Sequence, residues 1–250
     1  MISSMDKTKS LRAIKALLSL RDRRTWGPFV EAYETTRFDY SFGVSWSQSG
    51  EDLSILPLLA EIENGRYLDI GAHHPTRFSV TRHLFQRGWS GVNVDANHDL
   101  IQEFIEARPN DVSINFCVGN ESVYQLSVFH ESAISTVNPI WDERFKNEQN
   151  LRKTVRSVPG ISLRKLLDDY FPIKGPHFMN IDIEGADFDA LTSGDLGGLS
   201  NERRPLWILV ESIPPAVETL QTDTVRLLLG LDYEIWLILP FACLLKNKLS

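Results

Sequence analysis

The chain has 250 residues, of which 42% are hydrophobic and 24% are charged, with 13 Phe and 6 Trp available to fill an interior. A chain of this length and composition can bury a core without disulfides or a structural metal. Its net charge of −7 disfavours a general nucleic-acid binder, because an acidic surface repels the phosphate backbone.

The two cysteines, Cys117 and Cys243, lie in apolar, strand-like runs, without a second Cys or a His at metal-ligand spacing. Buried, reduced thiols are expected, in keeping with a cytoplasmic protein. The first ten residues are polar and contain no apolar signal-peptide core. The longest apolar run, Ile235 to Leu245, is shorter than the roughly 20 residues that span a bilayer. We therefore expect no transmembrane segment.

Residues 1–46 differ in character from the rest and are predicted to form an N-terminal helical and irregular extension. Apolar residues recur at helical spacing between Lys7 and Arg24, a stretch that also carries seven basic side chains. This pattern predicts an amphipathic helix. Contact of its basic face with a membrane surface or an anionic partner is the alternative to a solvated face. The aromatic residues of 26–46 favour packing on the domain over stacking on a sugar ring.

Strands and helices alternate along residues 47–250. The strand candidates are residues 66–70, 91–94, 112–118, 124–130, 178–183, 206–210, 233–239 and 241–245. The helix candidates are residues 53–62, 78–87, 100–107, 139–153, 162–170, 186–192 and 216–229. Such alternation predicts one α/β domain with a mostly parallel, seven-stranded, Rossmann-like sheet covered by helices on both faces. The last two strand candidates are separated only by a tight turn, so they must pair antiparallel.

The end of the first predicted strand has the features of a cofactor site. Asp69 stands just before the strand ends, and Gly71 and Ala72 follow, where glycine lets the backbone turn sharply and approach a ligand. Asp95 ends the second strand, where a Rossmann site places an acid to hold ribose hydroxyls. Its two oxygens can accept both hydrogen bonds. The alternative interpretation is a turn glycine with two surface aspartates.

The glycine pattern narrows the cofactor class. Gly71 stands alone, and His73 occupies the position of the second glycine of the dinucleotide fingerprint. This disfavours NAD or FAD, whose pyrophosphate needs close backbone approach, and favours a cofactor without phosphate, such as S-adenosylmethionine. Ala96 is predicted to contact the cofactor beside Asp95. Gly119 and Asn120, at the end of the third strand, are predicted to lie at the adenine edge.

Further motifs occur in order over residues 47–247. They are Gln48–Asp52, Leu68–Ala72, Arg87–Val92, Ala133–Thr136 and Met179–Asp187, and the most specific is Ile181–Gly185, Ile-Asp-Ile-Glu-Gly. On these motifs the chain resembles the FkbM-type methyltransferases, a family of S-adenosylmethionine-dependent O-methyltransferases. One departure is that the second strand ends Asp-Ala-Asn, where the family usually reads Glu-Pro-Asn. The carboxylate of Asp95 is thus retained, with a shorter reach.

The resemblance implies a class I methyltransferase fold and methyl transfer to a hydroxyl of a sugar, glycan or natural product. The acceptor is then a small molecule or a glycan, and the segments 25–47 and 130–160 are expected to select it. Two alternatives remain. One is a non-catalytic Rossmann-like binding module, and the other is a nucleotide-dependent oxidoreductase on the same fold.

Methyl transfer from a sulfonium to oxygen requires in-line alignment and removal of the hydroxyl proton. The candidate catalytic residues, at the carboxyl ends of strands or in the cofactor turn, are Asp182, Glu184, Glu211, His73 and His74, and Asp182 is also a candidate cofactor contact. Asp182 and Glu184 would share one face if the strand continued through both. The alternative roles are acids at a helix N-terminus and turn histidines bonded to backbone. The same groups could hold a divalent ion, but their spacing does not require one, and no metal is predicted.

Overall fold

The computed structural model describes residues 44–149, 152–212 and 216–249. The predicted basic helix and most of the aromatic stretch, up to residue 43, lie outside these described residues. Within the described part of the chain, no helix has the length and apolarity that a bilayer crossing requires.

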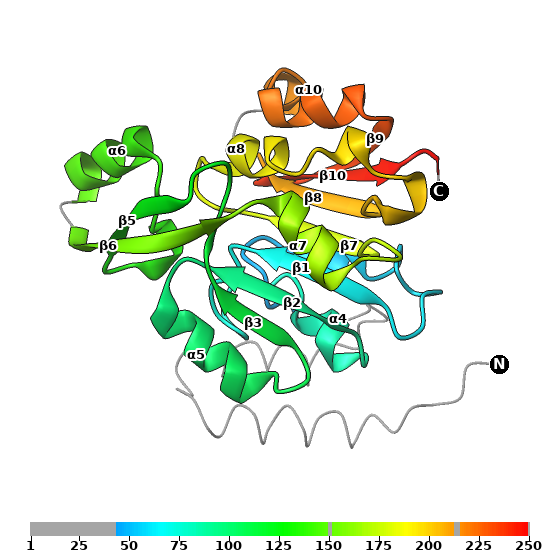
Figure 1. The fold of residues 1–250 in the computed structure, drawn as a ribbon, viewed down its shortest axis with the longest axis horizontal. Helices are drawn as coiled ribbons and strands as arrows, with labels where there is room; N and C mark the ends of the chain where they lie inside the picture. The colour runs from blue at the N-terminus through cyan, green and yellow to red at the C-terminus, as the bar shows by residue number, and fades with distance from the viewer. Residues whose placement is uncertain (1–43, 150–151, 213–215, 250) are drawn as a thin grey trace, which may run out of the picture. The chain divides into compact units, whose positions relative to one another are not determined.

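Seven strands form the main sheet, in the order β3-β2-β1-β7-β8-β10-β9 (Figure 1). They are β1 (Arg66–Ile70), β2 (Ser90–Asp95), β3 (Val112–Asn115), β7 (Phe178–Ile181), β8 (Trp207–Glu211), β9 (Tyr233–Ile238) and β10 (Ala242–Asn247). The first five pair in parallel, and β10 runs antiparallel to both of its neighbours. The predicted fold, a mostly parallel seven-stranded sheet with an antiparallel strand near the C-terminus, is confirmed.

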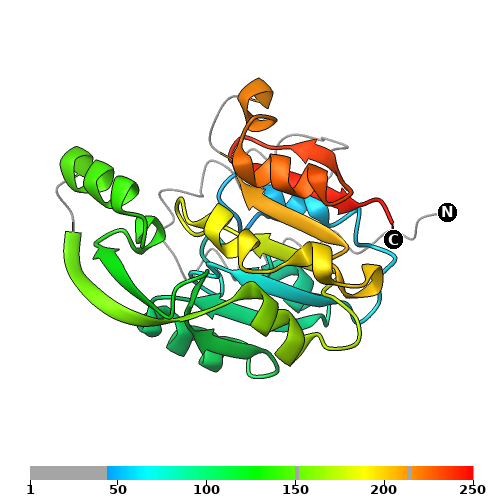
Figure 2. The same cartoon turned by 45° about the horizontal axis from the view of Figure 1, so that its top comes forward.

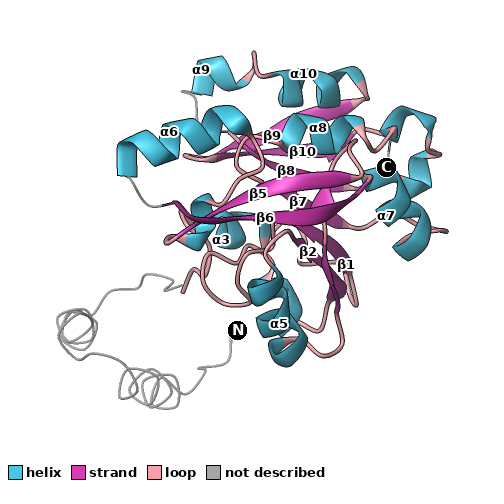
Figure 3. Cartoon of the chain, turned by 60° about the vertical axis from the view of Figure 1, so that its left-hand side comes forward, coloured by secondary structure: helices cyan, strands magenta, loops and turns pink. Residues whose placement is uncertain are grey.

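Helices pack on both faces of this sheet, and Figure 3 shows the strands between them. Leu68 belongs to a buried apolar cluster with residues of α7 (Leu163–Tyr170), α8 (Asp187–Thr192) and α10 (Asp223–Gly230). Its neighbour Tyr67 belongs to a second cluster, with α3 (Glu51–Ile55) and α4 (Arg82–Gln86). Successive residues of a strand point to opposite faces, so the apolar runs are buried on both sides. Helix α5 (His98–Ala107) follows β2 in the chain.

A second, three-stranded sheet stands out from the main sheet at one end (Figure 2). It contains β4 (Cys117–Val118), β5 (Val123–Phe129) and β6 (Arg152–Ile161), and α6 (Pro139–Gln149) lies between β5 and β6 in the chain. Strands β5 and β6 are antiparallel, whereas β4 pairs with β6 in parallel.

Three expectations are corrected in this region. The predicted strand 112–118 is two strands, divided at Phe116, and its second half belongs to the smaller sheet. The predicted strand 124–130 also lies there, outside the main sheet. The predicted helix 139–153 ends at Gln149, and β6 was not predicted. Basic residues interrupt the apolar alternation of β6, and Pro159 and Gly160 near its end have the composition of a turn.

Other boundaries also differ from the prediction. The helix expected over 78–87 begins only at Arg82, and that expected over 53–62 is the short α3 followed by turns. The helix expected over 216–229 is two helices, α9 (Ala216–Thr219) and α10, because Thr222 caps α10 with its side chain. Three short 3₁₀ turns complete the fold, at Ser132–Ile134, Leu196–Gly198 and Asn201–Arg203.

Candidate functional site

Three connected cavities lie at the carboxyl ends of the parallel strands, where open α/β sheets bind ligands. The β2 cavity is bounded by Val94–Asn97 and Phe116–Val118. The β8 cavity, of about 270 Å³, is bounded by Leu209–Glu211 and by residues of α6. A smaller junction cavity lies against the turn after β1. Asp182 and Glu184 line all three, so these two carboxylates mark where the cavities meet.

Asp95 is the polar anchor of the β2 cavity. Its two carboxylate oxygens accept hydrogen bonds from the backbone N–H groups of His73 and Asn97, at 2.9 and 2.7 Å. Each oxygen retains a second acceptor position. Burial raises the pKa of Asp95 to about 6. Most other walls of this cavity are apolar: Ile70, Val94, Ala96, Phe116, Cys117, Val118, Leu126, Ala133, Val137 and Ile183. The predicted residues Asp95 and Ala96 thus lie on one cavity.

Gly71 joins the ends of three strands. Its N–H donates to the Val94 carbonyl at 2.9 Å, and the Asp182 N–H donates to the Ile70 carbonyl at 3.1 Å. Gly71 has a left-handed φ of +76°, and a methyl group added to it would overlap the Asp182 carbonyl oxygen. The close approach that requires glycine here is therefore between two segments of the chain. Gly71 also lines the β2 and junction cavities.

Asp69 is almost fully buried and bound to neighbouring protein groups. Its carboxylate accepts a hydrogen bond from the Thr81 hydroxyl at 2.6 Å and another from the Asn180 amide at 3.0 Å. Burial raises the pKa of Asp69. Asp69 and Ala72 line only the junction cavity among the three. The contacts of Asp69 connect β1 to β7 and to the start of α4, which is a structural role.

The two histidines have different surroundings. His73 lines the β2 and junction cavities, and its Nε2 lies 2.9 Å from the Ser132 hydroxyl. Burial lowers the pKa of His73, which favours the neutral ring at neutral pH. The Nδ1 of His74 accepts the Arg77 N–H at 2.9 Å, and its Nε2 contacts Glu103 at 2.8 Å. His74 lines none of the three cavities, so of the two predicted histidines only His73 reaches the site.

Gly119 and Asn120 lie beyond the β2 cavity and do not line any of the three cavities. The Asn120 side-chain amide donates to Asp189 at 2.7 Å, and the Tyr124 hydroxyl donates to the same carboxylate at 2.7 Å. The structure instead places Phe116–Val118 on the cavity wall. Gly119 and Asn120 follow β4, the second of the two strands into which residues 112–118 divide.

Asp182, Glu184 and Glu211 form an acidic cluster, in which one oxygen of each carboxylate lies within 4.8 Å of the others. The strand predicted over 178–183 ends at Ile181, so Asp182 and Glu184 do not lie on one strand face. Glu184 and Gly185 instead form a turn with left-handed φ values of 51° and 86°. This turn returns the Glu184 side chain toward Glu211, which ends β8.

Side chains from the loop before α6 hold this turn in place. The Thr136 hydroxyl donates to the Glu184 carbonyl at 2.8 Å, and the Asn138 amide donates to the Gly185 carbonyl at 2.7 Å. The acidic cluster is therefore supported by backbone contacts from a different part of the chain.

The carboxylates of the acidic cluster repel one another. Asp182 is open to the cleft but has protein on its other sides, and this desolvation, with the charges of Asp69 and Glu51, raises its pKa to about 6. Desolvation and neighbouring carboxylates raise the pKa of Glu184 to about 8 and that of Glu211 to about 10. No described basic side chain forms an ion pair with any of the three. The cluster therefore holds its full negative charge at neutral pH only beside a compensating cation.

The β8 cavity is also lined by residues that were not predicted to be catalytic or to bind the cofactor. They are Gln48, Glu51, Phe78, Trp141, Arg144, Phe145, Asn180 and Phe241. The Gln48–Asp52 motif and the predicted acceptor segment 130–160 contain five of these eight residues. Trp141 and Phe145 are one helical turn apart on α6, with ring centroids 5.2 Å apart. Asn180 lies two residues before Asp182, a spacing that could have identified it.

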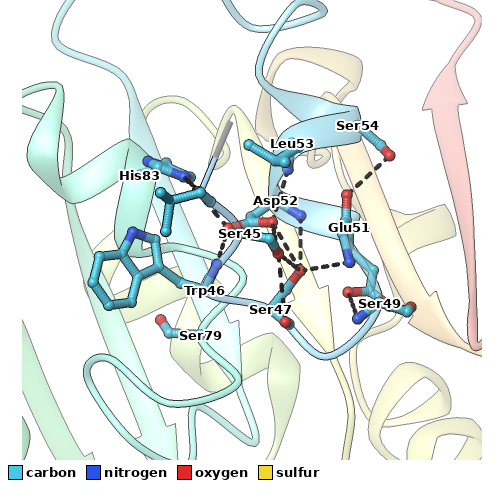
Figure 4. Close-up of polar contacts among 12 residues, drawn as sticks. Ser45, Trp46, Ser47, Ser49, Glu51, Asp52, Leu53, Ser54, Ser79 and His83 are labelled. Atoms are coloured by element: carbon cyan, nitrogen blue, oxygen red, sulfur yellow. Dashed lines mark hydrogen bonds and ion pairs between the residues drawn. The ribbon is translucent and has the colours of Figure 1, made fainter. Parts of the chain in front are cut away.

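Asp52 holds the start of the described chain against α3 (Figure 4). Its buried carboxylate accepts hydrogen bonds from the Ser45 hydroxyl, the Trp46 N–H and the Ser47 hydroxyl, at 2.7, 2.6 and 2.8 Å. These bonds fold residues 45–47 back onto α3. Gln48, the next residue, thereby reaches the β8 and junction cavities.

Sequence comparison identifies a family. The family model described as methyltransferase FkbM domain matches residues 69–235. No curated protein matches the sequence.

Comparison with solved structures finds distant neighbours. The methyltransferase FkbM of Methylobacillus flagellatus KT has 14% sequence identity and a TM-score of 0.47, over 80% of this chain and 48% of that one. The present chain thus spans about half the length of that protein. A precorrin-6y C5,15-methyltransferase from Geobacter metallireducens GS-15 has 10% identity and a TM-score of 0.44, over 83% and 92% of the two chains. Aeropyrum pernix fibrillarin, solved with bound S-adenosyl-L-methionine, has 10% identity and a TM-score of 0.39, over 77% and 72%.

Proposed function

The chain belongs to the FkbM methyltransferase family, and from this we propose that it is an S-adenosylmethionine-dependent O-methyltransferase acting on a hydroxyl of a sugar, glycan or natural product. The observation that carries the proposal is the pair of cavities that meet at Asp182 and Glu184. One has a ribose-type carboxylate and apolar walls, and the other has aromatic rings and carboxylates. Transfer between two bound molecules requires such a junction.

We assign S-adenosylmethionine to the β2 cavity. The Asp95 carboxylate has acceptor positions for the ribose hydroxyls, and Phe116, Val118 and Leu126 offer apolar surface for the adenine ring. The turn after β1 lacks the further glycines that a pyrophosphate would need, which fits a cofactor without phosphate. When bound, S-adenosylmethionine supplies an electrophilic methyl group.

We assign the acceptor to the β8 cavity. The rings of Trp141, Phe145 and Phe241 can cover the apolar face of a sugar or of a natural-product ring, and the carboxylates can accept its hydroxyl hydrogen bonds. Within the acidic cluster Asp182 has the lowest pKa, about 6, and is ionised at neutral pH. We therefore propose that Asp182 accepts the hydrogen bond, and then the proton, of the reacting hydroxyl.

The histidines have supporting roles in this scheme. The Nε2 of His73 is engaged by Ser132, and its backbone N–H donates to Asp95, so we propose that His73 positions Asp95. His74 holds the turn after β1 through its contacts with Arg77 and Glu103, and we propose no catalytic role for it.

We also propose that residues 47–250 form the methyltransferase domain and residues 1–46 an extension of it. Residues 44–46 are already bound to the domain, because the Val44 carbonyl lies 2.7 Å from His83 Nε2 and the Trp46 carbonyl accepts the Ser79 N–H at 3.0 Å.

Calorimetric titration with S-adenosylhomocysteine tests the cofactor site. We expect the wild-type protein to bind with a micromolar dissociation constant and Asp95→Ala to bind at least tenfold more weakly, a loss of about 1.4 kcal/mol. Asp169→Ala, which removes an exposed carboxylate that pairs with Lys165 on α7, is the matched control and should bind like the wild type. Absence of binding by the wild type would reject the proposal and favour a non-catalytic binding module.

Cofactor binding is expected to weaken in acid. Binding of the ribose hydroxyls uses the ionised carboxylate of Asp95, whose pKa burial raises to about 6. The dissociation constant for S-adenosylhomocysteine should therefore be constant above about pH 7 and rise toward tenfold per pH unit below pH 6. Titrations between pH 5 and 8 measure this.

The Asp95→Asn variant shows whether Asp95 or Asp182 causes this pH dependence. The distinction is needed because Asp182 lines the same cavity and has a similar pKa. The amide does not titrate, so this variant should bind weakly at every pH with a flatter profile than the wild type. A wild-type dissociation constant that does not change between pH 5 and 7 would contradict the assigned role of Asp95.

A further inference from the structure

We propose that Asp182, Glu184 and Glu211 bind a hard divalent cation, Mg²⁺, Mn²⁺ or Ca²⁺, where the three cavities meet. Carboxylate oxygens are the ligands that these ions prefer. One oxygen of each residue already lies within 4.8 Å of the others. Opposite oxygens around Ca²⁺ lie up to about 5 Å apart and those around Mg²⁺ about 4.2 Å apart. Three oxygens this close can become ligands of one ion through small side-chain movements, which are smaller for Ca²⁺ than for Mg²⁺ because Ca²⁺ has longer bonds and a more flexible geometry.

A fourth, buried carboxylate is a second observation that supports this site. Asp187 is only 6% exposed, and its Oδ1 has no hydrogen-bond partner among the described residues. The Asp187 carboxylate interacts electrostatically with the carboxylates of Asp182, Glu184 and Glu211. A buried, unpaired carboxylate oxygen is costly unless a charge compensates it. A cation bound among these four carboxylates would compensate the Asp187 oxygen.

Within the described ranges of the chain, no basic side chain forms an ion pair with these carboxylates. Among the described residues, the side chains of Asp182 and Glu184 accept no hydrogen bond and form no ion pair. Arg144, the basic residue that lines the β8 cavity, lies over the Trp141 ring at 4.9 Å. The acidic cluster is thus an oxygen-lined site that is open to the cleft on one side, as a site for an exchangeable ion would be.

The catalytic role of the ion rests on the proposed function, whereas the ion site does not. A cation at the junction would lower the pKa of a hydroxyl bound beside it. Each ligand needs only one oxygen, so Asp182 retains a second oxygen for the hydroxyl proton. The ion would therefore assist the step that the proposed O-methyltransferase assigns to Asp182.

Titration of the full-length protein with the ions alone tests the site. Protein freed of metal with a chelator is titrated with MgCl₂, MnCl₂ and CaCl₂ by calorimetry, without methyl donor, and its thermal unfolding is followed with and without each ion. We expect one ion per chain and a higher Tm for at least one salt. Glu211→Gln should weaken that binding at least tenfold and remove the ion-dependent shift in Tm.

The variants are chosen so that misfolding cannot imitate the result. Without ions, Glu211→Gln should be about as thermally stable as the wild type, because glutamine has nearly the size of glutamate and adds no charge to the acidic cluster. Glu106→Gln, the same exchange at an exposed position of α5, should bind ions like the wild type. No binding of any of the three ions at millimolar concentration, or equal binding by wild type and Glu211→Gln, would overturn the proposal.

Titration of the same samples with S-adenosylhomocysteine separates the two proposals. Ion binding without S-adenosylhomocysteine binding would support the cation site and reject the cofactor site. S-Adenosylhomocysteine binding without ion binding would support the cofactor site and reject the cation site.

Discussion

Gly71→Ala is expected to lower the free energy of unfolding by about 2–5 kcal/mol and to abolish binding of S-adenosylhomocysteine. Gly71 has a φ of +76°, which costs about 1–2 kcal/mol for a residue with a side chain. The added methyl would also overlap the Asp182 carbonyl, which is backbone and cannot rotate away. Forcing the ends of β1 and β7 apart adds a cost of about 1–3 kcal/mol. It also displaces Asp182, which lines both proposed binding cavities.

Gly88→Ala separates the two contributions. Gly88 has a similar φ of +86°, but a methyl there would meet no atom within 4 Å. This variant should lose only about 1 kcal/mol, the conformational part, and should bind S-adenosylhomocysteine normally. Urea unfolding of both variants measures the difference. If the free energy of unfolding fell equally in both variants, the close contact of Gly71 with Asp182 would not contribute to the effect of Gly71→Ala.

The main sheet was predictable because each of its strands is recognisable from its own short stretch of sequence. Residues 66–70 and 206–210 are short apolar runs that end in an acid or a glycine, and β1 and β8 lie there with shifts of one residue or less. Strands buried on both faces are apolar throughout. The alternation with helices then limits the topology to a parallel sheet.

The smaller sheet was not predictable in the same way. In its strand β6, basic and polar residues interrupt the apolar ones and Val155 is exposed, so the apolar pattern is weak. Its stability comes from pairing with β5, in which Tyr124 is opposite Val158. Pairing between distant segments is not encoded in either segment alone.

The candidate site was predictable where a residue's position along a strand determines its place. Asp95 and Glu211 end strands, and the carboxyl ends of parallel strands share one edge of the sheet. The proximity of Glu184 to Glu211 was not predictable from strand periodicity, because a left-handed turn at Glu184 produces it. Nor could sequence spacing separate His73 from His74, whose difference arises from contacts with Ser132 and Glu103.

Arg108→Met is expected to lower the free energy of unfolding by about 3–5 kcal/mol. The guanidinium of Arg108 is fully buried and donates four hydrogen bonds of 2.8–3.1 Å. The acceptors are the Tyr67 and Thr81 hydroxyls, the Pro75 carbonyl and the Ser79 hydroxyl. Methionine keeps the unbranched apolar stem but leaves these buried acceptors without their donor, and such groups cost about 1–3 kcal/mol each.

The matched control for this variant is Arg226→Met, which exchanges an exposed arginine on α10 and should change stability by no more than about 0.5 kcal/mol. Urea unfolding compares the two, and a loss below about 1 kcal/mol for Arg108→Met would show that water replaces the guanidinium. The loop from Pro75 to Thr81 connects this buried charge to the site, because Phe78 and Val80 line the β8 and junction cavities. Folded Arg108→Met protein should therefore lose affinity for the acceptor before it loses affinity for S-adenosylhomocysteine, whose proposed anchor, Asp95, does not contact Arg108.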